Sequence, residues 1–390
     1  MTQRAYRYRF YPTAEQENLL RRTLGCARLV YNRALAARTE GWYERQERIG
    51  YKETSAMLTE WKRDESLDFL NDVSCVPLQQ GLRHLQKAFA NFWAGRTQYP
   101  TFRKKRNGGS AEFTKSAFRW KNGQLFLAKC QEPLPIRWSR QLPQGATPST
   151  VTIRQDAAGR WFVSLLVDAE IEPLPPVSKK VGIDLGVTSL IVTSDGTKVA
   201  NPKTFKVKHK RLKRAQKALA RKQKGSNNRH QARLKVAKLH AEIVDSRKDF
   251  LHKLTTQLVR DNQTITVEDL NVKGMVKNHT LAQSISDASW GELVRQLTYK
   301  CEWYGRELVK IDRWFPSSKR CSCCGHIAEK MPLNVRNWVC PQCETKHERD
   351  VNAANNILAA GLAVSVCGAT IRPEQSKSVK AGATKQKPRS

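Results

Sequence analysis

The sequence predicts an α+β multidomain protein, in which a β-rich domain is interrupted by a helical insertion and followed by an α/β domain with a small cysteine-rich insert. Three observations indicate this organisation. Apolar residues recur at helical spacing early in the chain, short alternating strands follow, and two paired cysteine motifs interrupt a later series of strands and helices. A chain of 390 residues is long enough for two or three such domains.

The first predicted element is a half-buried strand. Tyr6, Tyr8 and Phe10 alternate with arginines, and Thr13 follows where a helix N-cap is expected. Helical spacing of apolar residues then runs through 19–31 and returns in 77–93. We therefore expect helices over both stretches, inserted between this strand and the later strands.

The segment up to about residue 172 alternates between short strands and turns. "VTIRQDAAGRWFVSLLVDAEI" is typical of two strands with a turn at 157–159, and Leu174-Pro175-Pro176 predicts a stiff connector. "VGIDLG" then predicts a short apolar strand with Asp184 at its end, and Asp195-Gly196 predicts the turn of the next hairpin.

Two further acidic residues occupy similar places later in the chain. "TITVEDL" predicts a buried strand that ends at Glu268, a helix is expected over 290–303, and "ELVKIDRWF" predicts one more strand before the cysteines. Asp350 precedes a run of helix-forming residues. Each of the three acids is thus expected at a strand end or a helix start, where the backbone holds a side chain rigidly.

The charge balance indicates the class of partner. The chain has 69 Lys and Arg against 35 Asp and Glu, a net charge of +34, and self-repulsion of this size is usually tolerated only where a polyanion neutralises it. Nucleic acid is the expected partner. No apolar run is long enough to span a membrane and the first residues lack a signal-peptide core, so we expect a cytoplasmic protein with access to the nucleoid and no membrane partner.

One basic tract stands out. From Lys203 to Lys238 there are fifteen Lys or Arg residues and no acid, and 225–228 divides the tract into two predicted helices. A charge run is often only a solvated helix face, but a run without acids cannot form the ion pairs that such faces use. We therefore expect phosphate contacts from this tract. The candidate residues are Lys208, Lys210, Arg211, Lys213 and Arg214.

The paired cysteines predict a zinc ribbon. Cys321 and Cys324 form one CxxC pair and Cys340 and Cys343 form the second, a spacing that lets four thiolates surround one Zn²⁺. Four sulfur ligands leave no open position, so the predicted zinc is structural. A disulfide scaffold and reduced core cysteines are the alternatives that this paired spacing disfavours. Three further side chains are spare ligand candidates: Cys323, His326 and His347.

Each acid taken alone is a weak signal. "GIDLG" also begins the phosphate loop of actin-like and sugar-kinase-like ATPases, Glu268 could be a surface acid at a strand end, and Asp350 could be a helix N-cap. Together, an acid in a first strand, one that ends a later strand and one that opens a late helix match the arrangement of RNase H-like nucleases. Three converging acids can hold two Mg²⁺ ions that cut a phosphodiester.

Eight sequence strings in order resemble a known family. They are "FYPTAEQENLLRRTLGCARLVYN", "VPLQQGLRHLQKAFANF", "YPTFRKKR", "GIDLGV", "VEDLNVKGM", "SISDASWGELVRQLTYKCEWYG", "WFPSSKRCSCCG" and "RNWVCPQCETKHERDVNAANNI". Over about residues 5–360 the chain resembles TnpB, the transposon-encoded, OrfB-type transposase-associated family of RNA-guided DNA endonucleases that is related to type V CRISPR effectors.

The resemblance implies a domain order. The implied parts are a wedge β-barrel over 1–20 and 106–176, a helical recognition insertion over 21–105, an RNase H-like (RuvC) nuclease domain over 177–315 and 346–367, a zinc-ribbon insert that loads the target nucleic acid over 316–345, and a disordered basic tail over 368–390. It also implies a guide RNA from the transposon end, a target duplex with a short adjacent motif, and one protein chain per guide RNA.

The family's site residues carry over onto matching positions. The catalytic, Mg²⁺-binding triad falls on Asp184, Glu268 and Asp350, and the zinc ligands fall on the four paired cysteines. Two departures are visible. Glu348 stands where relatives usually have Asp, and Glu344 follows the second knuckle where Gly is usual, so that turn is expected to be less relaxed.

Candidate readers of the adjacent motif lie in the N-terminal half. Gln79 and Gln80 offer amides beside Arg83, and by resemblance Tyr51, Gln79 and Thr114 are near positions that touch the motif. The alternative for both glutamines is that they cap a helix start after Pro77. The whole sequence predicts an RNA-guided, Mg²⁺-dependent DNA endonuclease; the alternatives are a nuclease-silent RNA-guided repressor and a cut-and-paste transposase.

Overall fold

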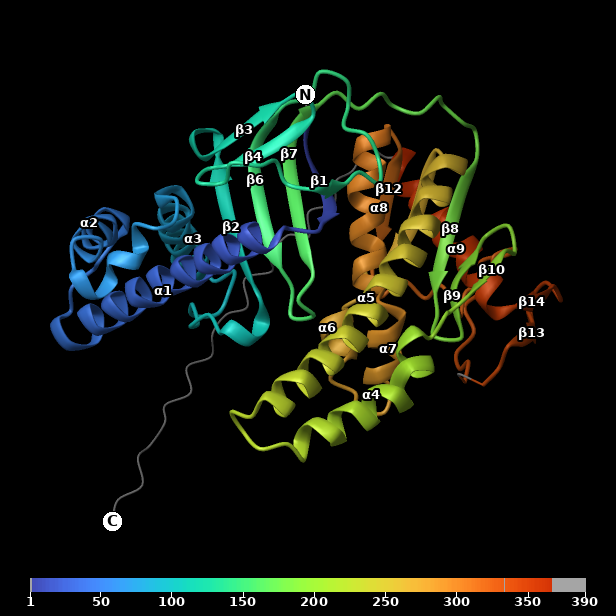
Figure 1. The fold of residues 1–390 in the computed structure, drawn as a ribbon. Coiled ribbons are helices and arrows are strands. Elements are labelled where there is room, and N and C mark those ends of the chain that lie inside the picture. The colour runs from blue at the N-terminus through green and yellow to red at the C-terminus, as the bar shows by residue number, and fades with distance from the viewer. Residues whose placement is uncertain (1, 333, 367–390) are drawn as a thin grey trace, which may run out of the picture. The chain divides into compact units, whose positions relative to one another are not determined.

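The computed structural model describes residues 2–332 and 334–366, and its chain forms two compact units (Figure 1). The first unit runs to Glu172 and includes Thr204–Lys248, and the second comprises Pro173–Lys203 and the chain from Asp249 onward. The mixture of helices and strands confirms the α+β class. The predicted domain boundaries stay predictions, and the expected tail over 368–390 lies outside the described residues.

The first unit is built on an antiparallel sheet with strand order β2-β6-β7-β1-β5. Alternating residues of these strands, such as Tyr8, Phe113 and Leu165, point into one apolar core. The turn at 157–159 joins β6 to β7, as the sequence predicted. The five strands are β1 (Thr2–Phe10), β2 (Gly109–Thr114), β5 (Ile136–Arg137), β6 (Pro148–Gln155) and β7 (Trp161–Ala169).

A separate hairpin covers the same core. Strands β3 (Phe118–Lys121) and β4 (Gln124–Leu127) pair with each other, and Leu125 lies in the core of the first sheet. Within the described residues no pairing joins β5 to β2, so the sheet stays open. Strand β5 is only two residues long, and Pro135 before it has no N–H to donate to a ladder. A closed wedge barrel therefore remains a prediction.

Three helices separate β1 from β2 in the sequence: α1 (Ala14–Arg45), α2 (Tyr51–Trp61) and α3 (Cys75–Trp93). Thr13 caps α1 as predicted, because its Oγ1 accepts the N–H of Gln16 at 3.3 Å while the Gln16 side chain accepts the Thr13 N–H at 3.2 Å. Helices α1 and α3 share an apolar core that includes Val30 and Leu82. Helix α2 was not predicted.

The basic tract forms two helices, α4 (Thr204–Ala220) and α5 (Asn227–Asp261), as the sequence predicted (Figure 1). A small apolar cluster that contains Leu212 and Ala215 of α4 with Leu239 and Ile243 of α5 holds them together. The remaining positions of α4 are left for charged side chains.

The sheet of the second unit has strand order β10-β9-β8-β11-β12. Strands β8, β9 and β10 form an antiparallel meander, whereas β11 and β12 run parallel to β8, so the carboxyl ends of β8, β11 and β12 lie at one edge. The strands are β8 (Lys180–Leu185), β9 (Ser189–Thr193), β10 (Lys198–Ala200), β11 (Thr264–Glu268) and β12 (Glu307–Ile311).

Helices cover both faces of this sheet. Helix α8 (Trp290–Tyr304) and the end of α5 bury Leu293, Leu297 and Leu254 in one core with β8 and β11. Helix α9 (Arg349–Val366) lies on the opposite face and touches the sheet closely. A Cβ at Gly182 would come within 2.1 Å of the Ala354 carbonyl oxygen, so only glycine permits this approach.

Short elements complete the second unit: α6 (Val272–Met275), α7 (Ala282–Ala288), and the paired strands β13 (Asn337–Val339) and β14 (Lys346–Glu348). The buried guanidinium of Arg306 donates hydrogen bonds to the carbonyls of Leu174 and Pro175 and so fixes the predicted connector. None of the described helices has the length and apolar character needed to cross a membrane.

Candidate metal centres

Asp184 lies at the end of β8, next to the parallel strand β11. The pKa of Asp184 is raised to about 7, first by burial and then by the negative charges of Glu268 and Asp350. Arg349 and Arg336 oppose the rise. Three acids that are distant in the sequence therefore interact electrostatically at one edge of the sheet.

Glu268 ends β11 beside Asp184 and is held by a neighbour that the sequence did not indicate. The buried Ser317 hydroxyl donates to the Glu268 carboxylate at 2.6 Å. Burial raises the pKa of Glu268, and this hydrogen bond opposes the rise. Ser317 thus fixes the carboxylate that a metal would contact.

Asp350 lies in the first turn of α9, which begins at Arg349. The suggestion that it is the helix N-cap is therefore wrong, because it already belongs to the helix. Arg336 pairs with its carboxylate at 3.3 Å. The Glu348 side chain, two residues earlier, instead forms an ion pair with Lys198 of β10. Glu348, which stands where relatives usually have Asp, thus has a structural partner in Lys198.

Two buried asparagines of α9 anchor the loop that leads into the cysteines. Asn356 donates to the carbonyls of Ser317 at 2.8 Å and Arg320 at 2.6 Å, and Asn352 also donates to Arg320 at 2.7 Å. The Ser322 N–H returns a hydrogen bond to Asn352. The helix that carries Asp350 therefore also positions Ser317, the partner of Glu268. Their i, i+4 spacing on α9 was the only signal in the sequence.

The four paired cysteines come together as predicted. Their sulfur atoms all lie within 4.8 Å of one another, and the pairs Cys321–Cys343 and Cys324–Cys340 are 3.6 Å apart. Tetrahedral Zn²⁺ with Zn–S bonds of about 2.3 Å requires sulfur separations of about 3.8 Å, so the donor set fits zinc.

The spare candidates do not enter this cluster. Cys323 is exposed, and His347 lies behind Cys321, with its Nε2 3.0 Å from that sulfur. The second knuckle carries the strain that its sequence suggested, because Glu344 has a positive φ of 55°. Thr345 lowers the pKa of Cys343 to about 6, which favours the thiolate that a metal binds.

The carboxylates are spaced differently from the thiols. Among the residues that the structure describes, the cysteines form a group of metal-ligating side chains with all ligand atoms within 4.8 Å, and the three acids do not. Like charges repel, and Ser317 and Arg336 each hold one acid. Hard oxygen donors in a mutually repelling set suit divalent cations such as Mg²⁺. Whether these acids bind Mg²⁺ stays a prediction.

The predicted phosphate-binding residues lie on α4. The side chains of Lys210, Arg211, Lys213 and Arg214 are exposed, on the sides of the helix away from its apolar contacts. Lys208 is partly buried and pairs with Glu242 of α5 at 3.3 Å. Four of the five candidates are therefore open to a ligand.

The predicted motif readers lie around α3. This helix begins at Cys75 after Ser74, so Gln79 and Gln80 lie within the helix and the capping alternative is wrong. Gln79 is exposed, on the side of a cavity of about 370 Å³ against α2. Tyr51 opens α2, and its hydroxyl accepts a hydrogen bond from Arg83 at 3.3 Å.

Gln80 and Thr114 lie near a contact between α3 and β2. His84 of α3 contacts Glu112 of β2 at 3.0 Å. Gln80 is one helical turn before His84, and Thr114 is two residues after Glu112, so each lies on the side of its element that carries this contact. Gln80 and Thr114 therefore lie on the sides of α3 and β2 that face each other at His84 and Glu112, whereas Gln79 lies on the α2 side.

Three family models match parts of this chain. The family OrfB_IS605, described as "Probable transposase", matches residues 162–279, and the family described as "Cas12f1-like, TNB domain" matches 290–357. A third family, described as "Helix-turn-helix domain", matches residues 1–47. Within this range the structure has strand β1 over Thr2–Phe10 and helix α1 over Ala14–Arg45.

Several relatives match nearly the whole chain, including the following two. A protein of Streptomyces pristinaespiralis is 59% identical over 96% of this chain and 93% of its own length, and one of Escherichia coli K12 is 34% identical over 94% of each. Both carry the name "Putative RNA-guided DNA endonuclease", followed by InsQ in the second.

A solved structure shares the fold. The chain in the cryo-EM structure of a Cas12f1–sgRNA–target DNA complex superposes with a TM-score of 0.54 at 16% identity, and the match covers 88% of this chain and 83% of that one. At this identity the likeness concerns the fold alone.

Proposed function

We propose that this chain, which belongs to the TnpB family of OrfB/IS605-type transposon proteins, is an RNA-guided DNA endonuclease that cuts duplex DNA next to a short motif. The near full-length relatives with that name support the class of activity. The observation that carries the proposal is the electrostatic coupling of Asp184 with Glu268 and Asp350 at one edge of a five-stranded sheet.

The sheet supports an RNase H-like nuclease site. Strands β10, β9 and β8 form an antiparallel meander, and β11 and β12 extend the sheet beside β8 in the parallel direction. The acids lie at the ends of β8 and β11 and at the start of α9. Ligands of such sheets bind outside the carboxyl ends of parallel strands. Phosphodiester cleavage requires acids at this edge, where a nucleic-acid strand can reach them.

Each residue has a definite task in the proposed reaction. Asp184, Glu268 and Asp350 would hold two Mg²⁺ ions, and such ions would supply a nucleophilic water and charge to neutralise the leaving 3′ oxygen. Ser317 fixes the rotamer of Glu268, and Arg336 offsets the charge of Asp350 before DNA arrives. The four cysteines would hold a structural zinc, which would make rigid the loop that Asn352 and Asn356 connect to α9.

The charge distribution supports a guide RNA and a DNA target as partners. Base pairing with a guide supplies sequence specificity, so the protein needs to grip an A-form heteroduplex only by shape and phosphate. A net charge of +34 and the exposed cations of α4 suit that task. We propose one chain per guide RNA, working in the cytoplasm.

Two other activities remain as outcomes of a test. The family description "Probable transposase" corresponds to strand transfer without a guide. A nuclease-silent repressor would bind DNA with its guide and leave it intact, and the presence of all three acids disfavours it.

The test is to purify the protein from cells that also transcribe the DNA on either side of its gene, and to sequence the RNA bound to it. The complex is then incubated in Mg²⁺ with a duplex that matches the variable end of that RNA and has randomised sequence beside the match. We expect a discrete RNA and cleavage only of matched duplexes. Binding without cleavage indicates the repressor, and strand joining without RNA indicates the transposase.

A further inference from the structure

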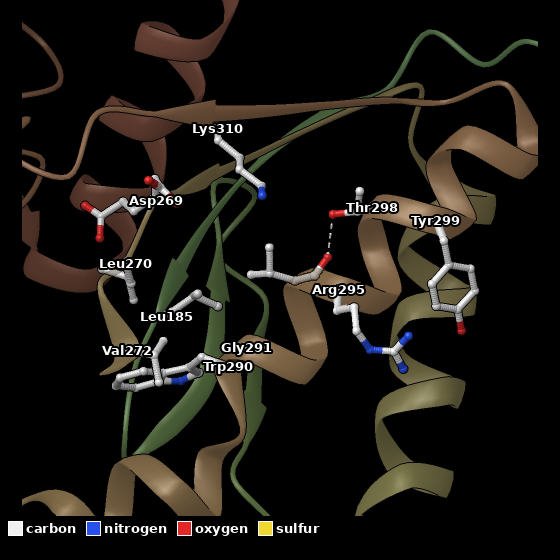
Figure 2. Close-up of a pocket in the computed structure, with 12 residues that line it drawn as sticks. Leu185, Asp269, Leu270, Val272, Trp290, Gly291, Arg295, Thr298, Tyr299 and Lys310 are labelled. Atoms are coloured by element: carbon white, nitrogen blue, oxygen red, sulfur yellow. Dashed lines mark hydrogen bonds between the residues drawn. The ribbon is translucent and has the colours of Figure 1, made fainter. Parts of the chain in front are cut away.

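A cavity of about 440 Å³ opens in the second unit at the carboxyl ends of β8, β11 and β12, against helix α8 (Figure 2). Glu268 is on one side of it, Leu185 and Trp290 belong to its apolar part, and Lys310 and Gly291 complete the wall. Its volume is in the range of about 300–1,000 Å³ that is typical of small-molecule sites.

Apart from Glu268, which borders both, the cavity lies on the other face of the sheet from the acid cluster but at the same edge. Successive residues of a strand point to opposite faces, so Asp184, which follows the α9-facing Gly182 by two residues, and Leu185 face opposite ways. A polymer that crosses the carboxyl edge of the sheet would therefore pass the acids and then this cavity without changing direction.

The charged groups around the cavity indicate the sign of the charge that a ligand would carry. Arg313 pairs with Asp269 at 3.0 Å, Glu292 pairs with Arg295 at 2.7 Å, and Ser317 holds Glu268. Lys310 is exposed, its amino group points toward the open space in Figure 2, and in the described part of the chain it has no ion pair or hydrogen bond from its side chain. An anion is the complementary ligand for this ammonium.

The apolar part has an unsatisfied donor. Trp290 is 3% exposed, and its indole N–H has no hydrogen-bond partner among the described residues. This nitrogen is closed to solvent, so Trp290 contributes its ring to the apolar wall and no donor to a ligand. A planar ligand with an apolar face suits such a wall.

We propose that this cavity binds one nucleotide of single-stranded DNA, next to the phosphodiester at Asp184, Glu268 and Asp350, with its phosphate on Lys310 and its base against the apolar lining beside α8. The assignment deepens the proposed nuclease function and rests on it. An anion linked to a planar base is the one ligand class that matches the free cation, the apolar wall and the adjacent acids together.

Gly291 offers a direct test. It lies in the first turn of α8 and lines the cavity, and a Cβ there would meet nothing within 4 Å, so a side chain can be added without strain in the fold. Gly291→Phe should fill the cavity. Gly291→Ala is the matched control, because it adds one methyl and improves helix propensity.

The first measurement does not need cleavage. Each protein is mixed in EDTA with single-stranded DNA that contains 5-iododeoxyuridine, irradiated, and digested to locate cross-linked peptides. We expect cross-links to the segment that contains Trp290 and Tyr299, reduced at least tenfold by Gly291→Phe and kept by Gly291→Ala. No cross-link in this segment, or an equal yield from Gly291→Phe, would overturn the assignment whether or not the protein is a nuclease.

Lys310 provides a second variant. Lys310→Gln should lower the same cross-link yield severalfold. The matched control is Lys180→Gln, an exposed lysine at the amino end of β8 and hence at the opposite edge of the sheet. An equal loss of cross-link yield in both variants would mean that only the net charge of the protein matters, and would contradict a phosphate contact at Lys310.

If the wild type cleaves, an abasic scan tests the same site in the reaction. Replacing one nucleotide at a time beside the cut with an abasic residue should slow cleavage at one position by roughly 5–100-fold, the equivalent of a lost base–aromatic contact of about 1–3 kcal/mol. Gly291→Phe should be slow on intact DNA and show no further loss at that position. Equal sensitivity at all positions, or fully additive losses, would refute the nucleotide site, whereas a wild type that never cuts refutes the proposed function instead.

Discussion

The two compact units hold their candidate functional side chains in different ways. In the second unit, Glu268 receives a hydrogen bond from buried Ser317, and buried asparagines of α9 tie the loop before the cysteines to the helix that carries Asp350. In the first unit, Gln79 and the cations of α4 are exposed. Chemistry demands fixed geometry, whereas a grip on phosphates requires only charge within reach.

The same contrast exists on a smaller scale between the two metal centres. The four cysteines already lie close together without a metal, and two cysteine pairs are 3.6 Å apart. Ionised carboxylates repel, and the pKa of Asp184 is raised to about 7 in part by its acidic neighbours. The cysteine site is thus preformed, whereas the three acids repel one another in the metal-free structure.

The largest effect is expected at the acids. Asp184→Ala, Glu268→Ala or Asp350→Ala should each abolish cleavage and leave guide-dependent DNA binding nearly unchanged, since each removes a metal ligand. Cleavage of a matched duplex and a filter-binding assay measure the two properties. The control is Glu348→Ala, which removes only a partly exposed ion pair with Lys198. Substantial cleavage by Glu268→Ala in Mg²⁺ would contradict the triad.

The next effect is loss of the zinc site. Cys321→Ser with Cys340→Ser should remove one zinc per chain and unfold the ribbon, because about 10 kcal/mol or more of apparent binding energy is lost with the site. Elemental analysis counts the metal, and limited proteolysis reports the ribbon. Cys323→Ser should behave as wild type, since Cys323 is exposed and outside the cluster. Zinc retained by the double variant would mean a different ligand set.

A graded effect is expected from the repulsion among the acids. The folded pKa of Asp184, about 7, is above its ordinary value of 3.8, so this group destabilises the metal-free fold increasingly as pH rises from about 4 to 7, and the penalty is constant above that. In EDTA at pH 8, Asp184→Asn should therefore raise Tm by several degrees, with a smaller gain at pH 5.

The control for this prediction has the opposite sign. Lys179 pairs with Asp195 at 2.9 Å and lowers the pKa of that carboxyl, so Asp195→Asn should lower Tm at pH 8. A drop in Tm with both substitutions would show that Asp184 is stabilised, not strained, by its surroundings.

A weaker and additive effect is expected on α4. Changing Lys210, Arg211, Lys213 and Arg214 to Ala should flatten the salt dependence of RNA binding, each lost phosphate contact lowering the log–log slope by roughly 0.7–0.9. Lys208→Ala should contribute less, because Lys208 already pairs with Glu242. An unchanged slope would indicate that the cations of α4 form only a solvated helix face.

Local signals in the sequence were sufficient for much of the fold. The cap at Thr13, the hairpin at Asp195-Gly196 and the break between α4 and α5 all follow from residues within a few positions of one another. Helix α2 escaped prediction because it buries little apolar surface, with Leu58 as its main core residue. Short strands β13 and β14 likewise carry little periodicity.

The candidate sites divide in the same way. Acids and cysteines are recognisable because their chemistry requires particular residue types at particular spacing. Ser317, Arg336 and Asn356 were missed, since a serine 49 residues from Glu268 gains its role only through folding. Motif readers were the least predictable, because any exposed polar residue on a helix can contact a base edge.

The smallest expected effect tests that last group. If the adjacent motif is read where α3 faces β2, Gln80→Ala with Thr114→Ala should relax the motif preference in a cleavage assay with randomised flanks, by about 1–3 kcal/mol per lost base contact. Gln79→Ala is the matched control, because Gln79 lies on the α2 side of the same helix. Guide RNA binding should be unchanged in both variants. A motif profile altered by Gln79→Ala alone would place the motif-reading residues at the cavity between α2 and α3, near Tyr51 and Arg83. In that case the side of α3 that faces α2, rather than the side that faces β2, would determine motif choice.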